Sequence, residues 1–256
     1  METALEKERL QKEVDVARTI QASLLPRSAP SSPSFDIDSI TTPASDVGGD
    51  YYDYVKFSNG SHGAIIADVS GKGVPAALYM ATLKGVVLAE MRRATGPADL
   101  LRRVNTTLHG SMERHTYITM TCVEFTNDCR SLRFARAGHT PTLLRRAGAT
   151  TVITPGGVAI GIVSPSMFDA ALEEVVIPVN AGDICLLTTD GVTERRDGAM
   201  NEIGLIPIST MLDSLEPTTA LDVVRHTLDL LERHAGDEDP HDDITIVALI
   251  VRGDNE

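Results

Sequence analysis

The chain has 256 residues, of which 42% are hydrophobic, so it can bury a substantial core as one main domain. Its formal net charge of −13 disfavours binding to nucleic acid, which needs a concentrated basic surface. No apolar run approaches the length of a membrane span, and the N-terminal METALEKERLQKEV is too charged for a signal peptide. Three cysteines fit neither a disulfide framework nor a zinc spacing, which predicts reduced thiols and a cytoplasmic protein: Cys122, Cys129 and Cys185.

Residues 2–24 contain neither proline nor glycine and predict one helix, which ends before Pro26. A 4-3-4-3 spacing places five residues on one side of it: Leu10, Val14, Ala17, Gln21 and Leu24. The helix could pack on its own domain, or it could be the end of a signalling or dimerising helix. The high charge of this segment favours the second interpretation. We therefore expect residues 1–30 to form an N-terminal linker or regulatory helix and residues 31–256 to form the main domain.

From Phe35 onward, short segments rich in β-branched residues alternate with two helical blocks. The predicted strands are 35–41, 51–57, 62–69, 117–125, 131–137, 141–146, 170–177, 183–189 and 243–251. The predicted helix pairs are 75–93 with 98–112, and 203–215 with 218–235. This order predicts an α+β fold, a four-layer α-β-β-α sandwich in which helix pairs flank a central antiparallel β-sandwich.

Four acidic segments each place an aspartate at the edge of an apolar run. They are DVGGDYYD (46–53), IIADVSGKG (65–73), CLLTTDGVTE (185–194) and HDDITIVALIV (241–251). Strand ends can converge in one crevice, where these carboxylates would concentrate too much negative charge without a cation. Carboxylates without a nearby Cys or His cluster favour Mg²⁺ or Mn²⁺ over zinc.

Seven motifs in a fixed order resemble the metal-dependent PPM (protein phosphatase 2C-like) serine/threonine phosphatases, and among them the bacterial SpoIIE/RsbU-type branch. They are IQASLLP, DVGGDYYD, ADVSGKGVPAAL, AGHTPTLL, GVAIGI, LLTTDGVTE and DDITIVAL. The resemblance runs from about residue 20 to about residue 252, nearly the whole chain. It implies that 31–256 is a phosphatase domain with two metal ions at one edge of an α-β-β-α sandwich.

The resemblance also implies the ligands of those ions. Asp68 is expected to bridge two Mg²⁺ or Mn²⁺ ions, Asp190 and Asp242 to hold one of them, and Asp50 to bind the other directly or through waters. Asp50, Asp68, Asp190 and Asp242 are thus the expected catalytic residues. The full set of expected metal ligands is Asp50, Asp68, the backbone carbonyl of Val69, Asp190 and Asp242, with Asp243 as the alternative to Asp242. Two such ions can neutralise phosphoryl oxygens and activate water, so no protein nucleophile is required.

The sequence departs from the eukaryotic pattern, which has a histidine two residues after the bridging aspartate, where this chain has Ser70. A metal-bound water, Ser70 or Lys72 could each assist the leaving oxygen. His139 is interpreted as a turn histidine that bonds its own loop. Among the basic doublets, Arg195-Arg196 is the candidate for contacting a substrate phosphate or an acidic partner.

The resemblance implies a phosphatase acting on phosphoserine or phosphothreonine in a bacterial regulatory protein. The implied substrate is a phosphorylated STAS-domain anti-sigma factor antagonist in a partner-switching pathway. The alternative is a catalytically weak or inactive phosphatase-fold scaffold. We also expect helix 2–24 to form a homodimer or to dock a sensor or activator, and to act on the metal site through helix 74–94.

Overall fold

The computed structural model describes residues 4–30, 32–113, 115–126, 130–216 and 218–253. Their strands form two five-stranded sheets in which every strand pair is antiparallel. The first sheet contains, in spatial order, β1 (Phe35–Thr42), β10 (Ile244–Val251), β9 (Ile184–Thr188), β6 (Thr142–Arg146) and β7 (Ala149–Ile153). The second contains β2 (Tyr51–Lys56), β3 (His62–Val69), β4 (Ile118–Phe125), β5 (Ser131–Ala137) and β8 (Glu174–Pro178).

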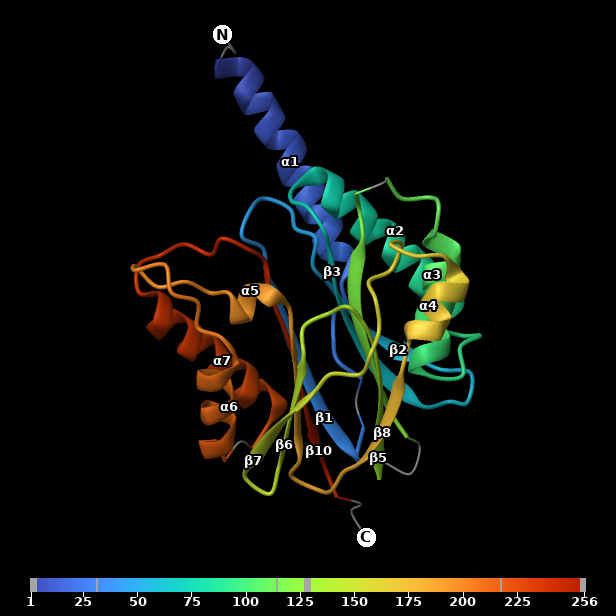
Figure 1. Cartoon of the computed structure of the whole chain (residues 1–256). Coiled ribbons are helices and arrows are strands. Elements are labelled where there is room, and N and C mark those ends of the chain that lie inside the picture. Colours follow the sequence, from blue (N-terminus) through green and yellow to red (C-terminus); the bar gives the residue numbers. More distant parts are fainter. Residues whose placement is uncertain (1–3, 31, 114, 127–129, 217, 254–256) are drawn as a thin grey trace.

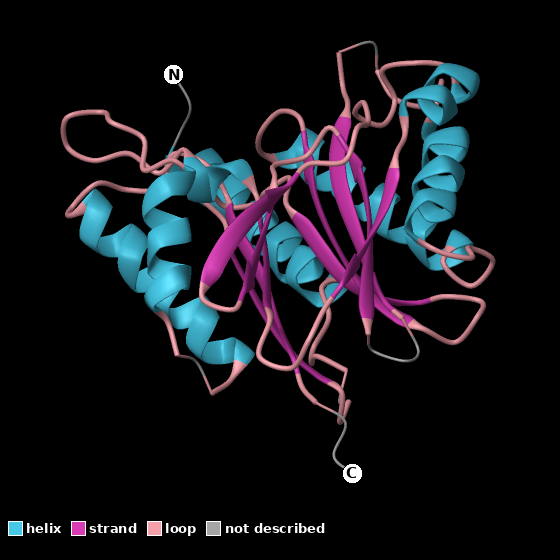
Figure 2. Ribbon diagram, turned by 60° about the horizontal axis from the view of Figure 1, so that its bottom comes forward, coloured by secondary structure: helices cyan, strands magenta, loops and turns pink. Residues whose placement is uncertain are grey.

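Helices cover the outer face of each sheet, so that the sheets lie between two helical layers (Figures 1 and 2). The second sheet is covered by α2 (Val74–Glu90), α3 (Pro97–Leu108) and α4 (Pro165–Ala171). The first is covered by α6 (Leu205–Ser214) and α7 (Ala220–Ala235). This arrangement confirms the predicted α+β sandwich with four layers.

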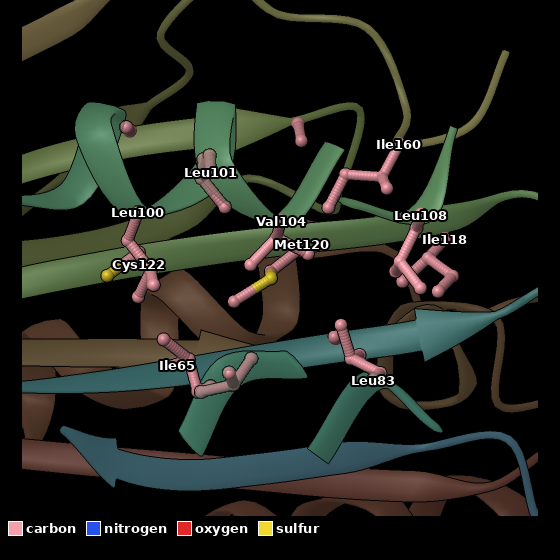
Figure 3. Packing of buried hydrophobic residues seen from close by; sticks show 14 of the residues in the cluster. Ile65, Leu83, Leu100, Leu101, Val104, Leu108, Ile118, Met120, Cys122 and Ile160 are labelled. Atoms are coloured by element: carbon pink, nitrogen blue, oxygen red, sulfur yellow. The ribbon is translucent and has the colours of Figure 1, made fainter. Parts of the chain in front are cut away.

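The central strands are apolar on both faces because both faces are covered. In β3, Ile65 packs toward the helices with Leu83 of α2, whereas the next residue, Ile66, packs between the sheets. Figure 3 shows Ile65 and Leu83 near side chains from α3 and β4. The strand that carries Asp68 is therefore held rigidly from both sides.

Two of the strands differ from the sequence prediction. The segment 170–177 was predicted as one strand, but α4 occupies 165–171 and β8 begins only at Glu174. The missed signal was Pro165 at the first helical position after Ser164. The hairpin strand β7 was also missed; its turn contains Ala147 and Gly148, whose φ angles of 49° and 81° suit a tight hairpin.

The N-terminal helix α1 (Ala4–Leu24) extends away from the body at its N-terminal end (Figure 1). Its last turns contact α2, and Leu24 packs against the α2–α3 core. Val14, Ala17 and Gln21 of the predicted seam are less exposed than their neighbours, whereas Leu10 is 50% exposed. The C-terminal part of α1 thus packs on its own domain, and its first turns are free to contact a partner.

No helix within the described part of the chain is long and apolar enough to cross a membrane. Cys122 and Cys185 are buried free thiols, whereas Cys129 lies outside the described residues.

Candidate metal centre

The predicted aspartates lie at strand ends that belong to both sheets. Asp68 lies near the end of β3 in the second sheet, and Asp190 follows β9 of the first sheet at the start of the short helix α5 (Asp190–Thr193). Asp242 and Asp243 directly precede β10. A cavity of about 90 Å³ is lined by Asp68, Asp242 and Asp243 together with Lys72. The fold therefore brings Asp68 and Asp243, which are 175 residues apart, to one edge of the sandwich.

Burial and mutual repulsion dominate the electrostatics of this edge. Burial, followed by the charges of Asp190 and Asp242, raises the pKa of Asp68 to about 7. Burial and the charge of Asp242 also raise the pKa of Asp190. Lys72 lowers both pKa values but does not cancel these effects. The surplus of negative charge is what a cation site requires.

Asp50, just before β2, is buried and held by two threonines. The hydroxyl groups of Thr189 and Thr245 donate to its Oδ2 at 2.8 and 2.6 Å. Burial and then the charge of Asp68 raise the pKa of Asp50 well above its usual value, although the two hydroxyl groups partly oppose this. The two threonines fix the position of this carboxylate. The sequence analysis missed both, although each lies within two residues of a predicted acid.

Asp242 and Asp243 have different surroundings. Both carboxylate oxygens of Asp243 accept backbone N–H groups, from Ala44 and Gly49, at 2.8 Å each. Asp242 lines the same cavity as Asp243, but its Oδ2 is 3.2 Å from Nζ of Lys72 rather than bonded to the loop before β2. This geometry favours Asp242 as the ligand and assigns Asp243 to holding the loop before β2.

The donor set fits a hard cation because it consists of oxygen atoms. A Cβ at Gly49 would lie 2.7 Å from the carbonyl oxygen of Val69 and 3.3 Å from Oδ1 of Asp68, so only glycine leaves these two oxygens accessible. In the part of the chain that the structure describes, no group of three or more His, Cys, Asp or Glu side chains already encloses a metal position. Oδ2 of Asp242 is paired with Lys72, and Oδ2 of Asp50 accepts the two threonine hydroxyl groups.

The candidates for assisting the leaving oxygen also have defined contacts. Ser70 Oγ accepts the backbone N–H of Tyr117 at 2.9 Å. Lys72 Nζ donates to the carbonyl of His241 at 2.6 Å and lies at the cavity. His139 is buried, and its pKa is lowered to about 3 because burial disfavours the charged ring. Its Nδ1 is 2.8 Å from Thr119 Oγ1 on β4, so it does not bond its own loop as predicted.

The basic doublet after α5 does not point to a substrate phosphate. Arg195 is buried and donates to the carbonyl of Glu238, which fixes the loop leading to Asp242. Arg196 forms an ion pair with Glu202 at 3.2 Å. Asp53, three residues after Asp50, pairs with Lys84 of α2 and accepts the hydroxyl group of Tyr51 at 2.7 Å, and so fastens α2 to β2.

Solved structures share this fold. The SiaA-PP2C domain of Pseudomonas aeruginosa aligns with 99% of this chain and 100% of its own length, with a TM-score of 0.84 and 23% identity. RsbX in complex with magnesium aligns with 88% of this chain and 98% of its own, with a TM-score of 0.63 and 14% identity. These likenesses show that the chain has the fold of the PP2C domains.

Sequence comparison gives the family within this class. The family model described as Stage II sporulation protein E (SpoIIE) matches residues 58–252, and the chain belongs to this family. Phosphoserine phosphatase RsbU of Bacillus subtilis (strain 168) is 29% identical over 248 residues, which cover 94% of this chain and 70% of RsbU. The predicted PPM family and its SpoIIE/RsbU branch are confirmed.

Proposed function

We propose that this chain is an Mg²⁺- or Mn²⁺-dependent phosphatase that hydrolyses phosphoserine or phosphothreonine in a regulatory protein. The observation that carries the proposal is the convergence of Asp68, Asp190 and Asp242 at one edge, where burial and then the charges of the other two raise the pKa of Asp68 to about 7. Bound at this edge, two cations supply positive charge for phosphoryl oxygens and make water more acidic. Asp50, Asp68, Asp190, Asp242 and the Val69 carbonyl would hold them.

The remaining groups orient the site. Thr189 and Thr245 hold Asp50, and Asp243 holds the loop before β2. Lys72 lies at the cavity with an exposed side chain, where its ammonium group can contact a phosphoryl oxygen of the substrate. The relative RsbU is by name a phosphoserine phosphatase, which supports a phosphoserine substrate here.

We propose a phosphorylated STAS-type regulatory protein as the substrate, on the resemblance to the SpoIIE/RsbU-type branch. Hydrolysis of p-nitrophenyl phosphate and of a phosphorylated STAS-domain protein is expected with Mn²⁺, and chelation is expected to abolish both because the carboxylates alone cannot neutralise a phosphoryl group. The assay measures released phosphate with and without chelator, and re-addition of Mn²⁺ is the control. Hydrolysis that persists after chelation contradicts the metal-dependent mechanism. A chain that takes up no Mn²⁺ through these carboxylates and hydrolyses neither substrate would favour the scaffold alternative.

We further propose that residues 1–30 are a regulatory segment and that α1 pairs with a second copy or docks a sensor. Its exposed apolar residues support this: Leu10, Val16 and Ile20 are 50%, 59% and 57% exposed. Leu10→Ser combined with Val16→Ser is expected to weaken self-association, because it removes apolar surface from the free turns of α1. Analytical ultracentrifugation of the whole chain measures this, and Thr107→Ser on α3 is the control. If the wild-type chain is monomeric, self-association through α1 is excluded, and a sensor is the proposed partner of α1.

A further inference from the structure

The side chain of Gln21 on α1 contacts the backbone of the loop that leads to Asp50. Its Nε2 donates to the carbonyl oxygen of Gly48 at 2.6 Å, and its Oε1 accepts the N–H of Gly48 at 3.1 Å. One amide thus pairs with both polar groups of one loop residue. Arg18, one turn earlier on the same face, donates to the carbonyl of Asp46 at 2.8 Å and pairs with its carboxylate. α1 therefore binds the loop at two points.

The same loop also lies against Asp243, the Val69 carbonyl and Asp68. Asp243 accepts the N–H groups of Ala44 and Gly49 through its two oxygens. A Cβ on Gly48 would lie 1.9 Å from Oδ2 of Asp243, and one on Gly49 would lie 2.7 Å from the Val69 carbonyl. Loop 43–50 is therefore a single layer of backbone between α1 and the site, and any shift of the loop changes these distances.

Hydrophobic packing does not by itself fix α1 over this loop. Between them lies a cavity of about 230 Å³ whose lining is largely apolar and includes the buried Asp50. Its other lining residues include Gln21, Ala22, Leu25, Thr41, Pro43 and Met80. Because close packing is missing here, the polar contacts of Gln21 and Arg18 form the local tether, and the cavity leaves room for α1 to move when they break.

We propose that Gln21 is a positioning residue through which α1 sets the geometry of the metal site, by way of loop 43–50. This inference rests on the proposed function of the site. This proposal differs from regulation through α2, because a movement of α2 would act on the turn that follows Asp68. A movement of Gln21 would act on loop 43–50, which contacts Asp243 and leads to Asp50. A helix that rotates or withdraws releases Gly48, which lies in the backbone segment that bonds Asp243 and leads to Asp50.

Hydrogen–deuterium exchange of the metal-free whole chain tests the tether directly. Gln21→Ala removes both hydrogen bonds, whereas Gln21→Glu keeps an acceptor for the Gly48 N–H but cannot donate to the Gly48 carbonyl. We expect exchange in peptides covering 43–50 to accelerate at least about tenfold in Gln21→Ala and less in Gln21→Glu, with peptides covering β3 unchanged. Ser23→Ala is the matched control, because Ser23 is exposed on the same helix and its hydroxyl group bonds only the carbonyl of Ile20.

Calorimetric titration with Mn²⁺ tests the consequence for the site. We expect affinity to fall about 10- to 100-fold in Gln21→Ala, the range typical for groups that orient metal ligands, while Ser23→Ala binds as the wild type does. If Gln21→Ala does not fold, Arg18→Ala, which removes an exposed side chain, is expected to give a smaller change in the same direction.

The two measurements separate the possible failures. Unchanged exchange in 43–50 overturns the tether, and faster exchange with unchanged Mn²⁺ affinity overturns its role in positioning the site. In both cases the proposed phosphatase function stands. If the wild-type chain takes up no Mn²⁺, the proposed function itself fails.

Discussion

Asp68→Asn is expected to lower kcat/KM for p-nitrophenyl phosphate by more than about a thousandfold, because the site loses the carboxylate that all its other acids surround. Asp68 lies near the end of a strand that is buried on both faces, so the asparagine side chain should keep the same position. Asp169→Asn, which changes an exposed acid on α4, is the control and should keep full activity. Activity near the wild-type level in Asp68→Asn contradicts the assignment of this site.

The same substitution is expected to stabilise the metal-free protein at pH 8. Since the pKa of Asp68 is raised to about 7 in the folded chain, the folded state holds a proton that the unfolded state releases near pH 4. The free energy of unfolding of the wild-type chain therefore falls as the pH rises from about 4 to 7. Above pH 7 the loss of stability caused by the charged Asp68 is complete. Asp68→Asn should recover on the order of 2–4 kcal/mol at pH 8 and nothing at pH 4, as measured by urea unfolding in chelator.

A loss of activity together with a gain of stability distinguishes a functional acid from a structural one. A structural aspartate stabilises the fold through its hydrogen bonds, so its removal costs stability. Asp243 fits that description, because two backbone N–H groups would lose their acceptor. The two aspartates should therefore respond with opposite signs to substitution by asparagine in the metal-free chain.

The sequence was informative where a local pattern determined the structure. Apolar runs that end in aspartate predicted the strand ends at Asp68 and Asp190, because strand length and burial are encoded within a few residues. Most of the helices and strands followed from periodicity for the same reason. Segment 149–153 was missed because it is half exposed and lacks the apolar alternation of the inner strands.

The contacts that orient the acids could not be predicted from the sequence. Asp243 bonds Ala44, which is 199 residues away, and Lys72 bonds His241, which is 169 residues away. Such pairs are specified by how the two sheets stack, and no local spacing reveals them. The role of Gln21 was hidden in the same way: its position on the helical seam was clear, but its partner is loop backbone, which carries no side-chain signature.

Gly49→Ala is expected to destabilise the chain by about 1–3 kcal/mol and to lower activity at saturating Mn²⁺ by at least about tenfold. The new Cβ would stand 2.7 Å from the carbonyl oxygen of Val69 and 3.3 Å from Oδ1 of Asp68. Backbone must shift to relieve the first contact, since no flexible side chain is involved. This shift would displace the loop that leads to Asp50. The added methyl group would also cover the Val69 carbonyl oxygen, which is expected to bind a cation. Thermal unfolding and p-nitrophenyl phosphate kinetics measure the two effects.

Gly85→Ala is the matched control, because the same methyl group is added where nothing lies within 4 Å, on the exposed side of α2. Alanine in a helix interior is expected to raise stability by about 0.5–1 kcal/mol and to leave activity unchanged. If Gly49→Ala behaved like Gly85→Ala, loop 43–50 could not lie against Val69 and Asp68 as the structure has it. If Gly49→Ala lost activity but kept its stability, the fold would tolerate a displaced loop. The loss of activity would then come only from the changed arrangement of the carboxylates. That outcome would make the loop a movable part of the site, which is what control by α1 through Gln21 requires.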